Sequence, residues 1–299
     1  MRVVAISGAG RSGSTFFSLL LSQHPDVFNL GQLRHLWRSF ENAEACSCGE
    51  TLRNCALYGD IVPVVHSRPG RVSPERMYAM GKAFIEDADK QSDWNDEDVR
   101  RQLSARHQDY LTAMQDVIGA IADRSGCRVM VDTSKTPATA LAFDLLADVE
   151  LFLLNLVRDP RAVAVSWQRR KGSARNTLSR VLDWKKRQRQ LERWRPALGE
   201  RFFTLRYEDL AAAPAATIQA VADRCGIPLP ADLFVEPDHA VVDWDTQHLY
   251  PPANEHVLAA QETDIRISVR EGWQDSKYHW IHLLTRLLAG RQMRDYYGS

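Results

Sequence analysis

The chain has 299 residues, of which 44% are hydrophobic and 25% are charged, an ordinary composition for a globular protein in water. Lysine and arginine together number 38, as do aspartate and glutamate, and this balance argues against a nucleic-acid-binding protein. We find no secretory signal and no run of the roughly 18 apolar residues that span a bilayer, so we expect a cytoplasmic protein without a membrane span. The length suits one large α/β domain, and we treat residues 1–299 as that domain.

Four short apolar or β-branched runs alternate with helical patterns along the chain. The runs lack polar alternation, which is typical of parallel strands that are buried on both faces. The order predicts an α/β fold, a P-loop-like doubly wound parallel sheet flanked by helices. The strands are expected at Arg2–Ser7, Arg128–Asp132, Leu151–Val157 and Arg201–Leu205, and the helices at Thr15–Gln23, Arg101–Asp123, Thr136–Leu146 and Pro214–Cys225.

Two segments carry unbalanced charge. A helical insertion is expected at about residues 63–123, and its acidic stretch Glu86–Asp98 is interpreted as a solvated face, with a lid over a substrate as the alternative. The segment Arg169–Arg195 has eleven basic residues and two acidic ones. It is either a solvated helical face or a guide for an anionic ligand.

The first predicted strand runs into a glycine-rich turn, Gly8–Thr15, and then into a helix. Such a turn directs backbone N–H groups at an anion, and the positive end of the helix dipole adds to the attraction. The spacing matches the Walker A frame, but Ser14 occupies the lysine position and the basic group is Arg11. The loop is therefore suited to a phosphate and poorly equipped for a γ-phosphate.

A second phosphate-binding segment follows the third predicted strand. Arg158 stands at the carboxyl end of that strand, where ligands of such sheets bind, and Ser166 lies two helical turns later. A guanidinium fork with a hydroxyl suits a phosphate dianion. The alternative is a surface loop with a local ion pair.

Four segments, in order, resemble the PAPS-dependent sulfotransferases, notably bacterial members, with a phosphosulfate loop like that of tyrosylprotein sulfotransferases. They are Arg11–Thr15, Asp132–Pro137, Leu156–Trp167 and Arg206–Leu210. The resemblance implies the sulfotransferase fold. It also implies a 5′-phosphosulfate loop (Gly10, Arg11, Ser12, Gly13, Ser14, Thr15), a 3′-phosphate site (Arg158, Ser166), an adenine contact (Tyr207) and a lysine near the sulfonate that acts with Arg11 (Lys135).

The implied reaction transfers the sulfonyl group of PAPS to a hydroxyl or amine of a small molecule, glycan or peptide and releases PAP, with no metal required. Two alternatives stay open. One is a nucleotide-dependent phosphotransferase with a modified P-loop, against which the missing Walker lysine counts. The other is a PAP-binding protein of the sulfotransferase type that has lost activity.

The general base is not evident from the motifs. Gln32 stands where related sequences have a glutamate, and an amide cannot accept a proton near neutral pH. His35 is the favoured substitute; Glu41 is another, and an acidic acceptor such as a phenol would need little help. Aromatic residues either line an acceptor cleft or fill a core: Trp37, Phe40, Tyr78, Phe84 and Trp94.

Two further regions remain ambiguous. The segments His248–Asn254, Ile265–Arg270 and Glu271–Trp273 resemble a degraded form of a C-terminal motif of bacterial sulfotransferases, which puts a cofactor contact there in doubt. The cluster Cys46, Cys48 and Cys55 lacks a fourth ligand and a common zinc spacing, so we favour structural thiols or a local disulfide over a metal site. Cys127 and Cys225 are interpreted as core residues.

Overall fold

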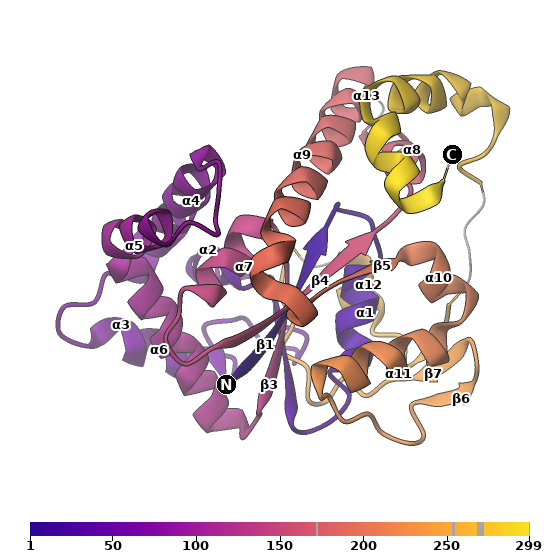
Figure 1. Cartoon of the computed structure of the whole chain (residues 1–299). Coiled ribbons are helices and arrows are strands. Elements are labelled where there is room, and N and C mark those ends of the chain that lie inside the picture. The colour runs from indigo at the N-terminus through magenta and orange to yellow at the C-terminus, as the bar shows by residue number, and fades with distance from the viewer. Residues whose placement is uncertain (172, 253–254, 268–271, 299) are drawn as a thin grey trace.

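A five-stranded parallel sheet lies at the centre of the computed structural model, which describes residues 1–171, 173–252, 255–267 and 272–298 (Figure 1). Its strand order is β2-β3-β1-β4-β5, with all four neighbouring pairs parallel. This arrangement confirms the predicted fold class. The strands are β1 (Arg2–Gly8), β2 (Val27–Gly31), β3 (Val129–Lys135), β4 (Glu150–Val157) and β5 (Phe202–Arg206).

Helices cover both faces of the sheet because its strands are apolar on both sides. In β1, Val3 and Ala5 belong to one core, whereas Val4 and Ile6 belong to the other. Helices α7 and α9 pack on the first face of β1 and β4, and α1 packs on β2, β3 and α11 at the second. The bounds are α1 (Ser14–Leu21), α2 (Leu36–Glu41), α3 (Tyr58–Ser67), α4 (Pro74–Lys90), α5 (Glu97–Arg106), α6 (Gln108–Ser125), α7 (Pro137–Asp144), α8 (Pro160–Lys171), α9 (Ala174–Leu198), α10 (Tyr207–Ala212), α11 (Pro214–Cys225), α12 (Glu255–Ala260) and α13 (His279–Tyr297), with 3-10 turns η1 (Leu33–His35), η2 (Gly199–Arg201) and η3 (Ser276–Tyr278).

The region of the expected helical insertion holds α3 to α6, which project to one side of the sheet (Figure 1). The single helix expected over Arg101–Asp123 is wrong: the chain leaves helical geometry at His107, which separates α5 from α6. His107 is buried, with its Nε2 3.1 Å from an Asp87 oxygen, so a tertiary contact accompanies the break. The acidic stretch also docks on the basic α9, since Asp89 accepts hydrogen bonds from Lys186 and Gln190.

Two strand regions were missed by the sequence patterns. The strand β2 has only five residues with an asparagine in the middle, and it forms because β3 offers a free edge. The C-terminal part of the chain forms a small antiparallel sheet. Each of its strands has three residues, which is too short to show an alternation of apolar and polar residues. These are β6 (Phe234–Glu236), β7 (His239–Val241) and β8 (Asp264–Arg266).

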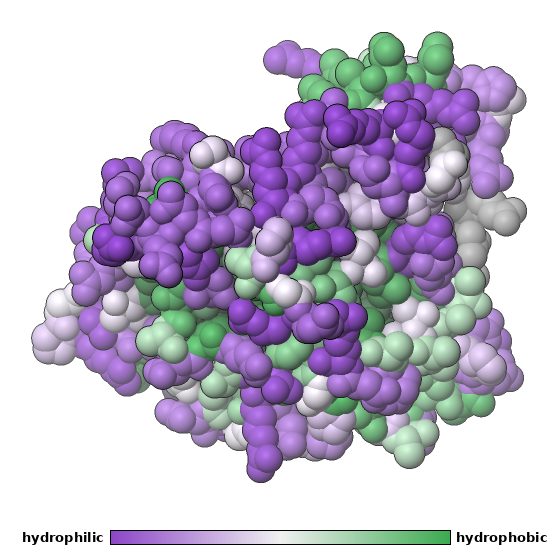
Figure 2. All heavy atoms as spheres, in the orientation of Figure 1, coloured by the Kyte–Doolittle hydropathy of each residue, from purple (hydrophilic) through white to green (hydrophobic). Residues whose placement is uncertain are grey.

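Hydrophobic side chains gather on the surface over α13 and the adjoining end of α9, at the top of the view in Figure 2. Leu287 is the most exposed of them, with 81% of its surface accessible. None of the helices in the described part of the chain is long and apolar enough to cross a membrane. The exposed apolar residues of these two helices are Leu178, Leu182, Trp280, Leu283 and Leu287.

Candidate active site

The glycine-rich turn joins β1 to α1 and presents the N-terminus of α1. At Gly8 the turn passes so close to β4 that a Cβ atom would lie 2.3 Å from the Leu156 carbonyl oxygen. Gly13 precedes the helix with a φ of 83°, and Arg11 also has a positive φ. The Ser12 hydroxyl donates to the Ala9 carbonyl at 2.8 Å and closes the turn. The first amides of α1 then face the carboxyl edge of the sheet, where an anion is stabilised by the helix dipole.

The hydroxyl of Ser14 is an unusual feature of this turn. It is buried and finds no hydrogen-bond partner among the residues that the structure describes. An unpaired buried hydroxyl costs about 1–3 kcal/mol, so such groups usually have a ligand or water as partner. Ser14 stands at the first position of α1, where a bound anion would accept its hydrogen bond.

Arg158 and Tyr207 close the other side of the turn. Arg158 follows β4 and donates through Nη1 to the Arg11 carbonyl at 2.6 Å, while its guanidinium lies 4.4 Å from the centre of the Tyr207 ring. The ring rests on Gly13, where a Cβ atom would come within 2.9 Å of it. Ser166 of α8 accepts a hydrogen bond from Arg11 Nε at 3.3 Å. The structure thus brings the two predicted phosphate segments and Tyr207 into one site.

Lys135 lies at the centre of a group of cations. It ends β3 with a φ of 66°, and burial, together with the neighbouring Arg187 and Arg34, lowers its pKa to about 8. Arg11 also repels it. Burial, followed by repulsion from Arg187, lowers the pKa of Arg34 as well. Asp132 offsets part of the repulsion at Arg34, and Arg187 is paired with Asp183 at 3.1 Å. An anion bound among these cations would relieve the remaining repulsion, so the group is suited to an anion.

Arg34 and Arg187 were not singled out by sequence reasoning. Arg187 projects from α9 and donates to the carbonyl oxygens of Gly8 at 3.2 Å and Lys135 at 2.9 Å, so it braces the ends of β1 and β3. It was visible only as one of eleven basic residues in Arg169–Arg195. Part of that segment therefore belongs to the site, and part is engaged elsewhere, as Lys186 is with Asp89.

His35 lies next to this cationic group, in the 3-10 turn after β2. Burial, followed by repulsion from Arg34 and Arg38, lowers the pKa of His35 to about 3, and Lys135 contributes too. The imidazole is therefore neutral near pH 7, and its Nε2 has no hydrogen-bond partner among the described residues. A neutral imidazole with an unused nitrogen can accept a proton.

The other candidates for the base are placed differently. The Gln32 amide is buried and donates to the Pro252 carbonyl at 3.3 Å. The Glu41 carboxylate lies 3.7 Å from Arg53. Of the five aromatic residues considered for an acceptor cleft, only Tyr78 is partly exposed, with its ring 5.8 Å from that of His35. The four that belong to the buried core are Trp37, Phe40, Phe84 and Trp94.

The remaining expectations concern the cysteines and the C-terminal segments. All five cysteines are free thiols, so the local disulfide is absent from this structure. Of the resembling C-terminal segments, residues 253–254 and 268–271 lie outside the described residues. The described residues 247–252 run along β2, with the Tyr250 hydroxyl donating to the Leu30 carbonyl at 3.1 Å.

Comparisons with known proteins agree with this geometry. A family model described as "Sulfotransferase family" matches residues 4–231. A sulfotransferase domain of the Synechococcus PCC 7002 olefin synthase is similar in structure, with a TM-score of 0.53, 17% identity, and coverage of 97% of this chain and 94% of that one. The sulfotransferase STF9 from Mycobacterium avium also has a TM-score of 0.53, with 15% identity and coverage of 99% and 77%. No curated protein matches the sequence significantly. The family match over most of the chain, together with the shared fold, shows that this protein belongs to the sulfotransferase family.

Proposed function

We propose that the chain transfers the sulfonyl group of PAPS to a hydroxyl or amine of an acceptor and releases PAP. The observation that carries the proposal is two adjoining groups of residues suited to anions at one sheet edge. One is the turn with the Ser14 hydroxyl, which has no partner among the described residues, and the other is Arg158 and Ser166, which each hydrogen-bond to Arg11. A nucleotide with anionic groups on both its 5′ and 3′ positions matches two sites. A phosphotransferase would need a basic residue at the Ser14 position for the γ-phosphate.

Each part of the donor has residues suited to hold it. The amides at the start of α1, with Ser14 and Thr15, suit the 5′-phosphosulfate, and Arg158 with Ser166 suits the 3′-phosphate. The Tyr207 ring lies between Arg158 and Gly13, next to both groups of residues, and is suited to contact the adenine base. Arg11 lies between them and contributes charge to both.

In the transfer step, the acceptor oxygen or nitrogen forms a bond to sulfur while the bond between sulfur and the phosphate oxygen breaks. The electron pair of that bond leaves with PAP, so negative charge develops on the bridging oxygen. Lys135 is largely protonated near pH 7 and stabilises this charge, together with Arg11. Positioning and fixed positive charge supply most of the catalysis, as in phosphoryl transfer.

His35 takes the proton of the acceptor in this proposal. Its low pKa in the free protein makes it a weak base; burial is the main cause, followed by repulsion from Arg34, Arg38 and Lys135. An anionic donor bound among these cations offsets their repulsion and raises the pKa of His35 towards a value useful in catalysis. The base is therefore strengthened when the donor is in place.

A ligand comparison tests the donor. Thermal unfolding is measured with PAP, ADP, AMP and ATP, each at the same concentration. A ligand at 100 times its Kd stabilises the folded state by about 2.7 kcal/mol, so differences in affinity appear as differences in Tm. PAP should stabilise the protein most, and a preference for ADP or ATP would instead support the phosphotransferase.

Turnover is tested separately with PAPS and a panel of phenols, sugars and peptides, with PAP formation as the readout. Release of PAP that depends on an acceptor supports the transferase. Tight binding of PAP without turnover on any acceptor would support the alternative of an inactive PAP-binding protein. The two measurements therefore separate donor recognition from catalysis.

A further inference from the structure

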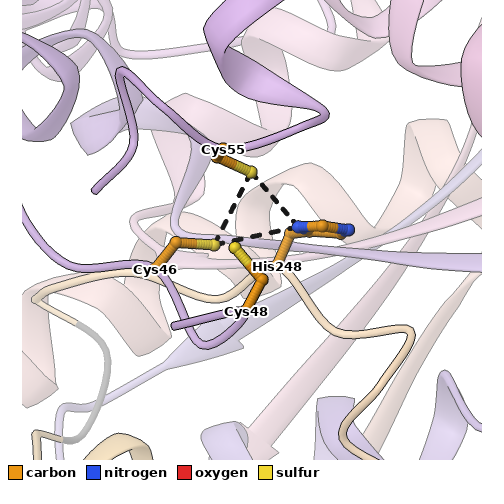
Figure 3. A group of neighbouring side chains, drawn as sticks. All are labelled: Cys46, Cys48, Cys55 and His248. Carbon is orange, nitrogen blue, oxygen red and sulfur yellow. Dashed lines mark hydrogen bonds between the residues drawn. The ribbon is translucent and has the colours of Figure 1, made fainter. Parts of the chain in front are cut away.

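Four metal-ligating side chains converge away from the proposed active site. Cys46, Cys48 and Cys55 come from the loop between α2 and α3, and His248 comes from the segment along β2 (Figure 3). Their ligand atoms all lie within 4.8 Å of one another. The Nδ1 atom of His248 is 3.2 Å from Cys55 Sγ and 3.8 Å from Cys46 Sγ. The Sγ atoms of Cys46 and Cys55 are 3.8 Å apart.

The three distances among Cys46, Cys55 and His248 are close to those around a tetrahedral zinc ion. With Zn–S of about 2.3 Å and Zn–N of about 2.0–2.1 Å, two sulfur ligands are about 3.8 Å apart and a sulfur and a nitrogen about 3.5 Å apart. A disulfide has its sulfur atoms at about 2.05 Å and would leave Cys48 and His248 without a role. The arrangement of four ligand atoms therefore fits an ion better than a bond between two of them.

We propose that Cys46, Cys48, Cys55 and His248 bind one zinc ion at a structural site. Three thiolates and an imidazole nitrogen are ligands that zinc prefers, and four protein ligands fill its tetrahedral coordination, as in structural rather than catalytic sites. The spacing of the three cysteines is not a common zinc arrangement, and zinc would need a histidine or a fourth cysteine to join them. His248 is that histidine, 193 residues beyond Cys55.

The loop around the thiols has the form that such a site needs. Gly49 adopts a φ of 91° and its amide donates to the Cys46 carbonyl at 3.1 Å, which turns the chain so that Cys46 and Cys48 face the same point. An antiparallel bridge between Ala45 and Thr51 closes this loop around Cys46 and Cys48.

The proposed ion joins two parts of the chain that also hold each other by hydrogen bonds. The Ser47 amide donates to the Leu249 carbonyl at 2.8 Å, and the Leu249 amide donates to the Ser47 hydroxyl at 2.9 Å. The same segment continues to Pro252, whose carbonyl accepts from Gln32 beside the active site. The zinc site would therefore anchor one end of the segment that holds Gln32.

Metal content of the full chain tests the proposal. The protein is purified under reducing conditions from zinc-supplemented cells and its metals are measured by mass spectrometry; we expect about one zinc per chain. Replacement by Co²⁺ should give the intense absorption of a tetrahedral thiolate site. Cys48→Ser and His248→Asn should lose zinc to a weak chelator several-fold faster than the wild type, whereas the control Cys127→Ser should not.

Cys48 is exposed, so Cys48→Ser is not expected to disturb the core; if either variant does unfold, His248→Cys keeps four ligands and should retain zinc. A chain with no zinc that binds none on titration overturns the proposal. The proposal is also overturned if the chain binds iron in place of zinc, or if both variants keep as much zinc as the wild type. A mass lower by two hydrogen atoms, from a disulfide between Cys46 and Cys55, overturns it as well. None of these readouts depends on PAPS or on turnover.

Discussion

Replacing Arg158 with glutamine tests whether the second anion site recognises a 3′-phosphate. Arg158 also donates to the Arg11 carbonyl and stacks on Tyr207, so its loss will loosen the turn and weaken the binding of every nucleotide. The informative quantity is therefore the preference for PAP over AMP, because AMP lacks the 3′-phosphate and the shared loss cancels between the two ligands.

The expected magnitude follows from the contact. The Arg158 Nη1 atom is occupied by the Arg11 carbonyl, so we assign one further charge-assisted hydrogen bond to the phosphate. A hydrogen bond to a charged group contributes about 1.5–3 kcal/mol, which corresponds to about 10-fold to 150-fold in affinity. The preference for PAP over AMP should fall by that factor in Arg158→Gln.

Binding of PAP and AMP is measured by calorimetry for the wild type, for Arg158→Gln and for a matched control, Arg161→Gln. Arg161 stands three residues away, and its guanidinium is paired with Asp159 at 2.6 Å. The control should keep the preference for PAP. If Arg158→Gln weakens PAP and AMP by the same factor, Arg158 only braces the turn, and our assignment of the 3′-phosphate site is refuted.

Four further variants probe the turn and the base. Turnover of His35→Ala should fall about 10²-fold to 10⁴-fold with PAP affinity little changed, and near-normal turnover would remove His35 as the base. The pKa of folded His35 is about 3, below its ordinary value, so unfolding takes up a proton as the pH falls from about 6.5 to 3. In that window the Tm of the wild type should fall faster than the Tm of His35→Ala. Parallel curves of Tm against pH would contradict the low pKa. Ser14→Ala should leave the free protein at least as stable as the wild type while weakening the binding of PAP. Ser12→Ala should lower the stability by about 0.5–1.5 kcal/mol, because it removes the hydrogen bond to Ala9. Equal losses of stability in the two variants would show that Ser14 already has a partner. Gly13→Ala should cost about 1–3 kcal/mol in chemical denaturation because of its positive φ and the nearby Tyr207 ring, and an unchanged midpoint would contradict both causes.

Local sequence accounts for much of this protein. The predicted strands that precede Gly8 and Arg158 form as expected, because buried parallel strands need continuous apolar runs. The phosphate turn is also local: its glycines, hydroxyls and following helix are adjacent in the chain, and their hydrogen bonds join near neighbours such as Ser12 and Ala9. Motifs of this kind can be recognised without knowing what packs against them.

Tertiary structure decided the rest. The short strand β2 exists because β3 offers it an edge, and Arg187 reaches Gly8 across 179 positions of sequence. His248 approaches Cys55 only because its segment runs along β2, so the set of four metal ligands has no spacing signature in the chain. The sequence by itself determined four of the five strands of the central sheet, the glycine-rich turn and the family. The cationic group, the neutral state of His35 and the proposed zinc site depend on burial and on contacts between distant segments, which residue order does not encode locally.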